Sequence, residues 1–247
     1  MRVGLFVTCL VDLMRPSIGF AALRLLEAAG CQVVVPAGQT CCGQPGYNSG
    51  DFAAARRLAL RWVEDFADCD YVVAPSGSCA AMMRVHYPRL FPADVAAGRR
   101  LTDLAARTWE LTRFLVEVLR FERPPGTWRG VITYHDSCSG LRELGVKNQP
   151  RNLLARMPGV ILRELENCET CCGFGGTFSV KFGELSTRMA EHKCAAIQAS
   201  GAAAVVGGDL GCLMHIEGRL RRRGDTVTRV LHVAEVLAGE QGVVPCK

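Results

Sequence analysis

The sequence predicts an α/β protein made of two pseudo-repeated lobes, each a mostly parallel sheet covered by helices. Two observations support this prediction: short apolar strand candidates alternate with helical segments, and one cysteine pattern occurs twice. The chain of 247 residues is 49% hydrophobic, which suffices for a substantial core. We place the boundary near residue 125, so that residues 1–125 and 126–247 form two cysteine-rich domains.

Four cysteines of the first lobe recur in the second lobe in the same order. The pairs are Cys9 with Cys138, Cys41 with Cys171, Cys42 with Cys172 and Cys79 with Cys212, at offsets of 129, 130, 130 and 133 residues. Near the end of each lobe, Glu117-Val118-Leu119 matches Glu235-Val236-Leu237. The stretch Arg123-Pro124-Pro125-Gly126 is typical of a linker between such repeats.

Strands and helices are expected to alternate within each lobe. Strands are expected at residues 3–7, 33–35 and 71–74, and again at residues 131–133, 160–162 and 203–206. Pro16 suits the first turn of a helix that Gly30 can end, and Asp51 can cap the next helix. A further helix is expected over residues 187–199. This alternation favours parallel sheets covered by helices.

The repeated cysteines come just after the predicted strands. The carboxyl ends of parallel strands meet at one edge of a sheet, where the loops form a binding crevice. We therefore expect the cysteines of each lobe to converge, so that one sheet edge per lobe presents four thiols.

Four thiols at one edge point to metal chemistry. Thiolates are soft ligands that favour iron–sulfur clusters, zinc or copper(I), and four thiolates per site are typical of clusters. In Cys41-Cys42-Gly43 and Cys171-Cys172-Gly173, the glycine permits backbone angles that let two adjacent sulfurs reach one site. Structural zinc is the alternative occupant, and buried unreactive cysteines are the plainest alternative.

The duplicated pattern resembles a known family of cysteine-rich proteins with paired Cys-Cys-Gly domains. The motifs that carry the resemblance are Tyr134-His135-Asp136-Ser137-Cys138, Cys171–Lys181, Gly211-Cys212-Leu213-Met214-His215, Cys41-Cys42-Gly43-Gln44-Pro45 and Ser76-Gly77-Ser78-Cys79. This family includes a cysteine-rich subunit of heterodisulfide reductase and the iron–sulfur subunits of glycolate oxidase and anaerobic glycerol-3-phosphate dehydrogenase. The resemblance covers nearly the whole chain and is strongest to members that serve lactate utilisation.

The resemblance implies an oxidoreductase-complex subunit that transfers electrons in a cytoplasmic complex oxidising L-lactate to pyruvate. It implies partner subunits, an electron acceptor and one or two iron–sulfur clusters of the [4Fe-4S] type. Relatives carry a further cysteine where this chain has Met82 and His215, so each lobe offers four thiolates here. A thiol/disulfide reductase subunit of the heterodisulfide reductase type, a glycolate oxidase-type subunit and a zinc-stabilised scaffold are the competing functions.

Three residues beside the repeated set are candidates for further roles. His135 can donate a hydrogen bond to a cluster sulfur or serve the structure alone. His215 is a candidate nitrogen ligand or an ordinary hydrogen-bonded histidine. Cys168 forms a Cys-x-x-Cys pair with Cys171 and is an extra ligand or a bystander.

Composition excludes several other classes of protein. A net charge of +5 gives little reason to expect nucleic acid, and no segment is apolar and long enough to insert into a membrane. The start of the chain lacks a cleavable signal, so we expect a cytoplasmic protein. No complete nucleotide-binding loop is present. Cys194 is expected in the core, and Cys31, Cys69 and Cys246 receive no chemical role.

Overall fold

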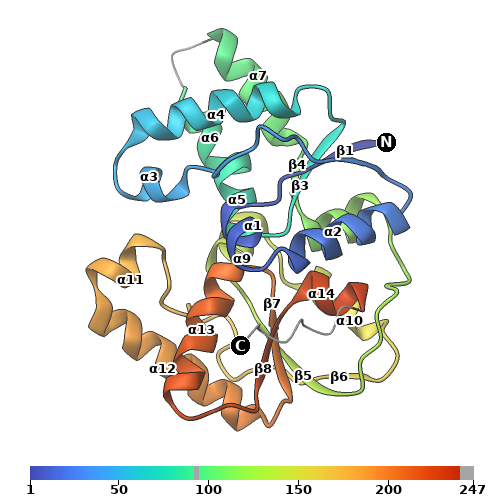
Figure 1. The fold of residues 1–247 in the computed structure, drawn as a ribbon, viewed down its shortest axis with the longest axis vertical. Coiled ribbons are helices and arrows are strands. Elements are labelled where there is room, and N and C mark those ends of the chain that lie inside the picture. The colour runs from blue at the N-terminus through green and yellow to red at the C-terminus, as the bar shows by residue number, and fades with distance from the viewer. Residues whose placement is uncertain (92–94, 240–247) are drawn as a thin grey trace.

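The computed structural model describes residues 1–91 and 95–239, so Cys246 lies outside the described residues. Within them the chain forms two four-stranded sheets, with strand orders β2-β1-β3-β4 and β6-β5-β7-β8 (Figure 1). Every strand pair is parallel. The predicted fold class, two pseudo-repeated α/β lobes, is therefore confirmed. The boundary near residue 125 stays a prediction.

The central strands agree with the sequence prediction, whereas one edge strand in each sheet was not predicted. The strands are β1 (Arg2–Leu5), β2 (Gln32–Val34), β3 (Tyr71–Ala74), β4 (Thr108–Glu110), β5 (Gly130–His135), β6 (Val160–Leu162), β7 (Ala204–Gly207) and β8 (Arg229–His232). The unpredicted β4 and β8 begin with polar residues and span three and four residues. Such short segments give no clear period, and pairing with β3 and β7 makes them strands.

Helices cover the sheets and carry the predicted caps. In the first lobe they are α1 (Cys9–Met14), α2 (Ser17–Ala28), α3 (Gln44–Asn48), α4 (Phe52–Phe66), α5 (Gly77–Ala81), α6 (Tyr87–Arg89), α7 (Val95–Ala106) and α8 (Leu111–Arg113), with π-helical turns η1 (Met82–His86) and η2 (Phe114–Val118). In the second lobe they are α9 (Cys138–Leu144), α10 (Asn148–Ala155), α11 (Thr177–Lys181), α12 (Gly183–Ser200), α13 (Leu210–Arg222) and α14 (Val233–Ala238). Asp51 caps α4, because its Oδ1 accepts from Ala54 N at 2.9 Å. The helix expected at residues 187–199 starts four residues earlier, at Gly183.

One apolar core runs through both lobes. It joins side chains of the first lobe such as Leu25 and Phe114 to side chains of the second such as Leu153 and Leu237. Helix α14 packs against α2, where Ser17 Oγ donates to Glu235 Oε1 at 2.7 Å. A separate core on the outer side of the first sheet lies beneath α4 and α7. The two sheets are thus held in one body (Figure 1).

The predicted match of Glu117 with Glu235 is wrong by one helical turn. Strand register pairs Ala74 with Glu110 in the first sheet and Gly207 with His232 in the second. Glu110 and His232 each cap the helix that follows, accepting from a backbone N–H at 2.9 Å and 3.1 Å. Glu235 comes three residues after His232, so its first-lobe equivalent is Arg113, three residues after Glu110, and not Glu117.

The lobes meet where α5 crosses α9, near the centre of Figure 1. A Cβ atom at Gly77 would lie 2.8 Å from Gly140 Cα, so the two backbones touch without side chains between them. Gly77 N also donates to Gly208 O at 3.3 Å. This close crossing brings the loops after the first-lobe strands next to those of the second. Among residues 1–91 and 95–239, no helix combines the length and apolarity needed to cross a bilayer.

Candidate metal centres

Four thiols converge in the first lobe, as the sequence predicts. Cys9 begins α1, Cys41 and Cys42 lie in the loop after β2, and Cys79 lies in α5. The thiols form a continuous chain in which Cys9 contacts Cys41, Cys41 contacts Cys42, and Cys42 Sγ lies 3.4 Å from Cys79 Sγ. Thr8 caps the helix that Cys9 begins, so the cysteine sits at a helix start that favours negative charge.

The second lobe repeats this arrangement in the same order. Cys171 hydrogen-bonds to Cys138 on one side and to Cys172 on the other, and Cys172 hydrogen-bonds to Cys212. Ser137 caps α9 directly before Cys138, as Thr8 does before Cys9. The eight cysteines predicted from the repeat therefore form two chains of four thiols.

The glycine of each Cys-Cys-Gly motif has a defined task. Gly43 and Gly173 have φ angles of +78° and +90°, which side chains rarely adopt. In this conformation each glycine N–H donates to the first cysteine Sγ of its motif, at 3.4 Å in both lobes. At Gly173 a Cβ would also lie 2.7 Å from Ser186 O. The motif thus directs both sulfurs to one site while the backbone stabilises a thiolate.

Hydrogen bonds divide the thiols of each chain into different protonation states. Hydrogen bonds from Cys42 and Cys9 lower the pKa of Cys41 to about 2. In the second lobe, hydrogen bonds from Cys138 and Cys172 lower the pKa of Cys171 to about 2. The pKa of Cys42, which donates to Cys41, is raised accordingly. In each chain the hydrogen bonds thus favour the thiolate form of one cysteine, and the thiolate is the form that binds metal.

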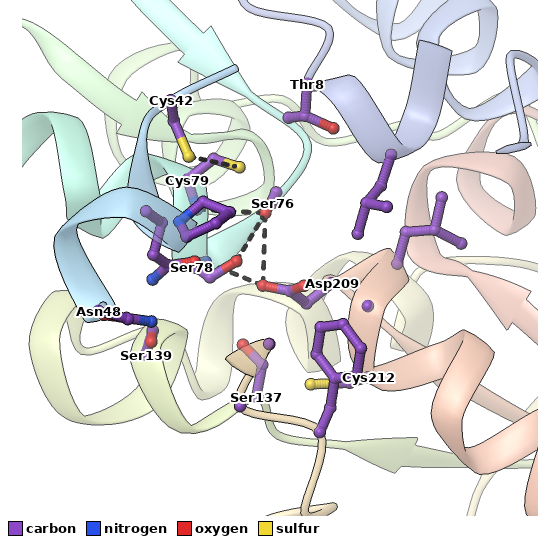
Figure 2. A pocket seen from close by; sticks show the side chains of 18 of the residues that line it. Thr8, Cys42, Asn48, Ser76, Ser78, Cys79, Ser137, Ser139, Asp209 and Cys212 are labelled. Carbon is purple, nitrogen blue, oxygen red and sulfur yellow. Dashed lines mark hydrogen bonds between the residues drawn. The ribbon is translucent and has the colours of Figure 1, made fainter. Parts of the chain in front are cut away.

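Both thiol chains open onto one cavity of about 600 Å³ between the lobes. Its wall includes Cys9, Cys41, Cys42 and Cys79 from the first lobe and Cys138 and Cys212 from the second. Figure 2 shows Cys42 and Cys79 on one side of this cavity and Cys212 on the other. His86 of η1 and Glu143 of α9 also line it, with Nε2 and Oε2 2.5 Å apart.

Asp209 is a site residue that the sequence prediction missed. Its Oδ2 accepts from Ser78 N at 2.8 Å and from Ser76 Oγ at 3.3 Å, which ties the lobes together beside the cavity (Figure 2). Burial raises the pKa of this carboxyl group. The available signal was positional, since Asp209 precedes Cys212 by three residues, as the helix cap Ser76 precedes Cys79.

Two further residues of the motifs have structural partners. Asp136 is fully buried, and its two oxygens accept hydrogen bonds from the two terminal nitrogens of Arg151, both at 2.8 Å. This pair orders the turn before Cys138. His215 Nε2 lies 3.2 Å from Ser186 Oγ, and the same hydroxyl donates to Gly173 O. His215 therefore helps to fix the second Cys-Cys-Gly turn through Ser186.

The remaining candidates differ in burial and contacts. Cys168 is half-buried outside the thiol chain, and burial raises its pKa. Cys194 is fully buried in the core, as predicted. Cys31 and Cys69 are buried away from both thiol chains. His135 is 1% exposed, and both its ring nitrogens lack a hydrogen-bond partner among the described residues.

The donor sets fit a thiolate-ligated metal group. Four thiols in a continuous chain, with the pKa of one lowered by its hydrogen bonds, supply the soft ligands that iron–sulfur clusters and zinc require. Buried inert cysteines do not account for a repeated chain of thiols in which one Sγ accepts a backbone N–H. The structure thus defines a duplicated cysteine-rich protein with metal-binding potential in each lobe.

The comparisons agree with this class. The family described as "Cysteine-rich domain" (CCG) matches residues 3–84 and 132–217, and the chain belongs to this family with two copies of the domain. It is 48% identical to Lactate utilization protein A of Geobacillus kaustophilus (strain HTA426), over 96% of this chain and 98% of that protein. It is 46% identical to Lactate utilization protein A of Bacillus subtilis (strain 168), over 96% and 99% of the two chains.

A solved structure shares the fold at low sequence identity. A hypothetical protein from Helicobacter pylori superposes with a TM-score of 0.69 and 9% identity. The alignment covers 98% of this chain and 49% of that one, so this chain spans about half of its length. This likeness concerns the fold alone.

Proposed function

We propose that this chain is an iron–sulfur electron-transfer subunit of a cytoplasmic complex that oxidises L-lactate to pyruvate. The observation that carries the proposal is the pair of four-thiol chains, in each of which a glycine N–H donates to the Sγ of one cysteine. The high identity to proteins named for lactate utilisation supports the substrate. Bound clusters would supply one-electron transfer, and Cys9, Cys41, Cys42 and Cys79 with Cys138, Cys171, Cys172 and Cys212 would hold them.

The residues of the chain prepare these sites in three ways. The glycine N–H groups of the two motifs stabilise thiolate charge. The helix starts at Cys9 and Cys138 add favourable partial charge. The shared core fixes the lobes, so both sites face one cavity at a constant separation. Partner subunits would bind lactate and an electron acceptor, since clusters move single electrons.

Metal and sulfide analysis tests the cluster assignment. After anaerobic purification we expect stoichiometric iron and acid-labile sulfide, with loss of one site's iron in Cys171→Ala. Cys194→Ala is the matched control, because Cys194 lies in the same lobe but in the core. Iron content that is equal in wild type and Cys171→Ala would contradict the assignment. Stoichiometric zinc without sulfide would select the scaffold function.

Growth tests the substrate assignment. Cells that lack this chain are expected to lose growth on L-lactate as sole carbon source. The wild-type gene should restore growth, and a gene carrying Cys42→Ala and Cys172→Ala should not. Loss of growth on glycolate but not on lactate would instead select the glycolate oxidase-type subunit.

The cavity favours a second candidate function, thiol/disulfide reduction. A space of about 600 Å³ bordered by thiols of both lobes has room for a small disulfide substrate. This function predicts disulfide turnover by the isolated, reconstituted chain. Absence of turnover with intact clusters would leave electron transfer as the function.

A further inference from the structure

The two thiol chains differ in what packs behind them. His135 precedes Cys138 by three residues, and the residue three before Cys9 is Phe6. Both lie at the carboxyl end of the first strand of their sheet, and both are buried. The second lobe therefore has an imidazole where the first has a phenyl ring.

The helix beside each Cys-Cys-Gly turn, α4 or α12, also has an apolar side chain in the first lobe and a polar one in the second. A Cβ at Gly43 would approach Ala55 of α4, and a Cβ at Gly173 would approach Ser186 of α12, so the helices correspond at an offset of 131 residues (186 − 55). At this offset Lys193 takes the place of Trp62. Trp62 is 3% exposed and Lys193 is 2% exposed, so both positions are interior.

The first lobe shows that this architecture does not need an imidazole for folding. Phe6 fills the position with apolar contacts, its ring 6.0 Å from that of Phe66. Burying a polar group without a partner costs about 1–3 kcal/mol. His135 bears this cost at both ring nitrogens, because neither has a hydrogen-bond partner among the described residues. A metal bound to one ring nitrogen would remove the cost at that nitrogen.

The free nitrogens lie beside the second thiol chain. Ligand atoms of His135, Cys172 and Cys212 all lie within 4.8 Å of one another, and all three residues are buried. We infer that His135 is a nitrogen ligand of the second-lobe metal centre, which makes that centre a mixed imidazole–thiolate site. The inference rests on the proposed metal function and adds a chemical difference between the two lobes.

Lys193 is a positioning residue for this site. Its Nζ donates to Cys168 O at 3.0 Å and to Asn167 O at 3.3 Å, in the loop that leads to Cys171. Its side chain is buried near the second thiol chain, where the first lobe has the indole of Trp62, and burial lowers its pKa. A neutral imidazole ligand raises the reduction potential of an iron–sulfur centre relative to thiolate ligation. A cluster held there by His135 would therefore be more easily reduced than one held by thiolates alone.

Pulsed electron paramagnetic resonance on reconstituted protein labelled with ¹⁵N-histidine tests the ligand. Wild type is expected to show the strong hyperfine coupling of a directly bonded nitrogen. His135→Phe should lose this coupling but keep its fold and the iron of both sites, because Phe6 fills the same position beside the four thiols of the first lobe. His135→Cys should keep the iron without the coupling and lower the potential of that centre. His215→Phe is the matched control and should keep the coupling.

Each contrary result has a separate meaning. Protein that contains iron and sulfide in both lobes but shows no strongly coupled histidine nitrogen would overturn the inference and leave the proposed function standing. A coupling that persists in His135→Phe and disappears in His215→Phe would assign the ligand to His215 and also overturn it. Protein with no iron in either lobe would overturn both.

Discussion

Replacement of Gly173 by alanine separates two physical demands of the Cys-Cys-Gly turn. The φ of +90° costs a side chain about 1–2 kcal/mol in this region. The new Cβ would also lie 2.7 Å from Ser186 O and 2.9 Å from Met189 Cβ, and such overpacking costs about 1–3 kcal/mol. We therefore expect the metal-free protein to lose about 2–5 kcal/mol of unfolding free energy.

Gly30→Ala is the matched control for this prediction. Gly30 has a φ of +83°, but a Cβ there would meet nothing within 4 Å. It should lose only the backbone cost of about 1–2 kcal/mol. Urea unfolding monitored by circular dichroism measures both losses. Equal losses in the two variants would refute the argument that α12 contacts force a glycine at this turn.

Three further predictions concern the fold around the site. Burial lowers the pKa of His232 from 6.5 to about 3, so its stability contribution is complete above pH 6.5 and is lost as pH falls. Below pH 6.5 the unfolding free energy of wild type should therefore fall faster than that of His232→Asn, by up to about 1.4 kcal/mol per pH unit. Urea unfolding at several pH values measures this, and parallel pH profiles of the two proteins would contradict it. Asp136→Asn breaks a buried ion pair with Arg151 and should cost about 3–5 kcal/mol in thermal unfolding, whereas the exposed Glu169→Gln should melt close to wild type. Leu25→Ala should cost about 2–5 kcal/mol because Leu25 is fully buried, whereas the exposed Phe20→Ala should leave the urea midpoint nearly unchanged.

The sequence was sufficient for the features that repeat. The apolar run at residues 71–74 matches its strand to the residue, because a central strand of a parallel sheet is buried on both faces. The run at residues 160–162 also matches its strand, β6, at the sheet edge. The thiol convergence followed from topology alone, since each cysteine group comes after a strand and parallel strands end at one edge. Asp51 was recognisable as a cap because the interaction is local.

Features that depend on contacts between distant segments could not be predicted in this way. The edge strand β4 becomes a strand through its pairing with β3 and has no apolar alternation of its own. Asp209 gains its place in the site from Ser76 and Ser78, more than a hundred residues earlier in the chain. The sequence indicates His135 as a donor to a cluster sulfur, but only the packing of its neighbours shows that its ring nitrogens lack partners among the described residues.

The packing of α14 on α2 bears on how this chain folds as it is synthesised. The bond between Ser17 and Glu235 joins residues 218 positions apart, and Gly126 N donates to Leu237 O across the same region. When the first 125 residues have left the ribosome, α2 can pack on elements of its own lobe, but its contact with α14 requires residues 233–238. The part of the core that the two lobes share therefore stays incomplete while the second lobe is synthesised. Contacts that close such a long loop are expected to form late in folding, so the relative position of the two thiol sites is expected to be fixed late as well.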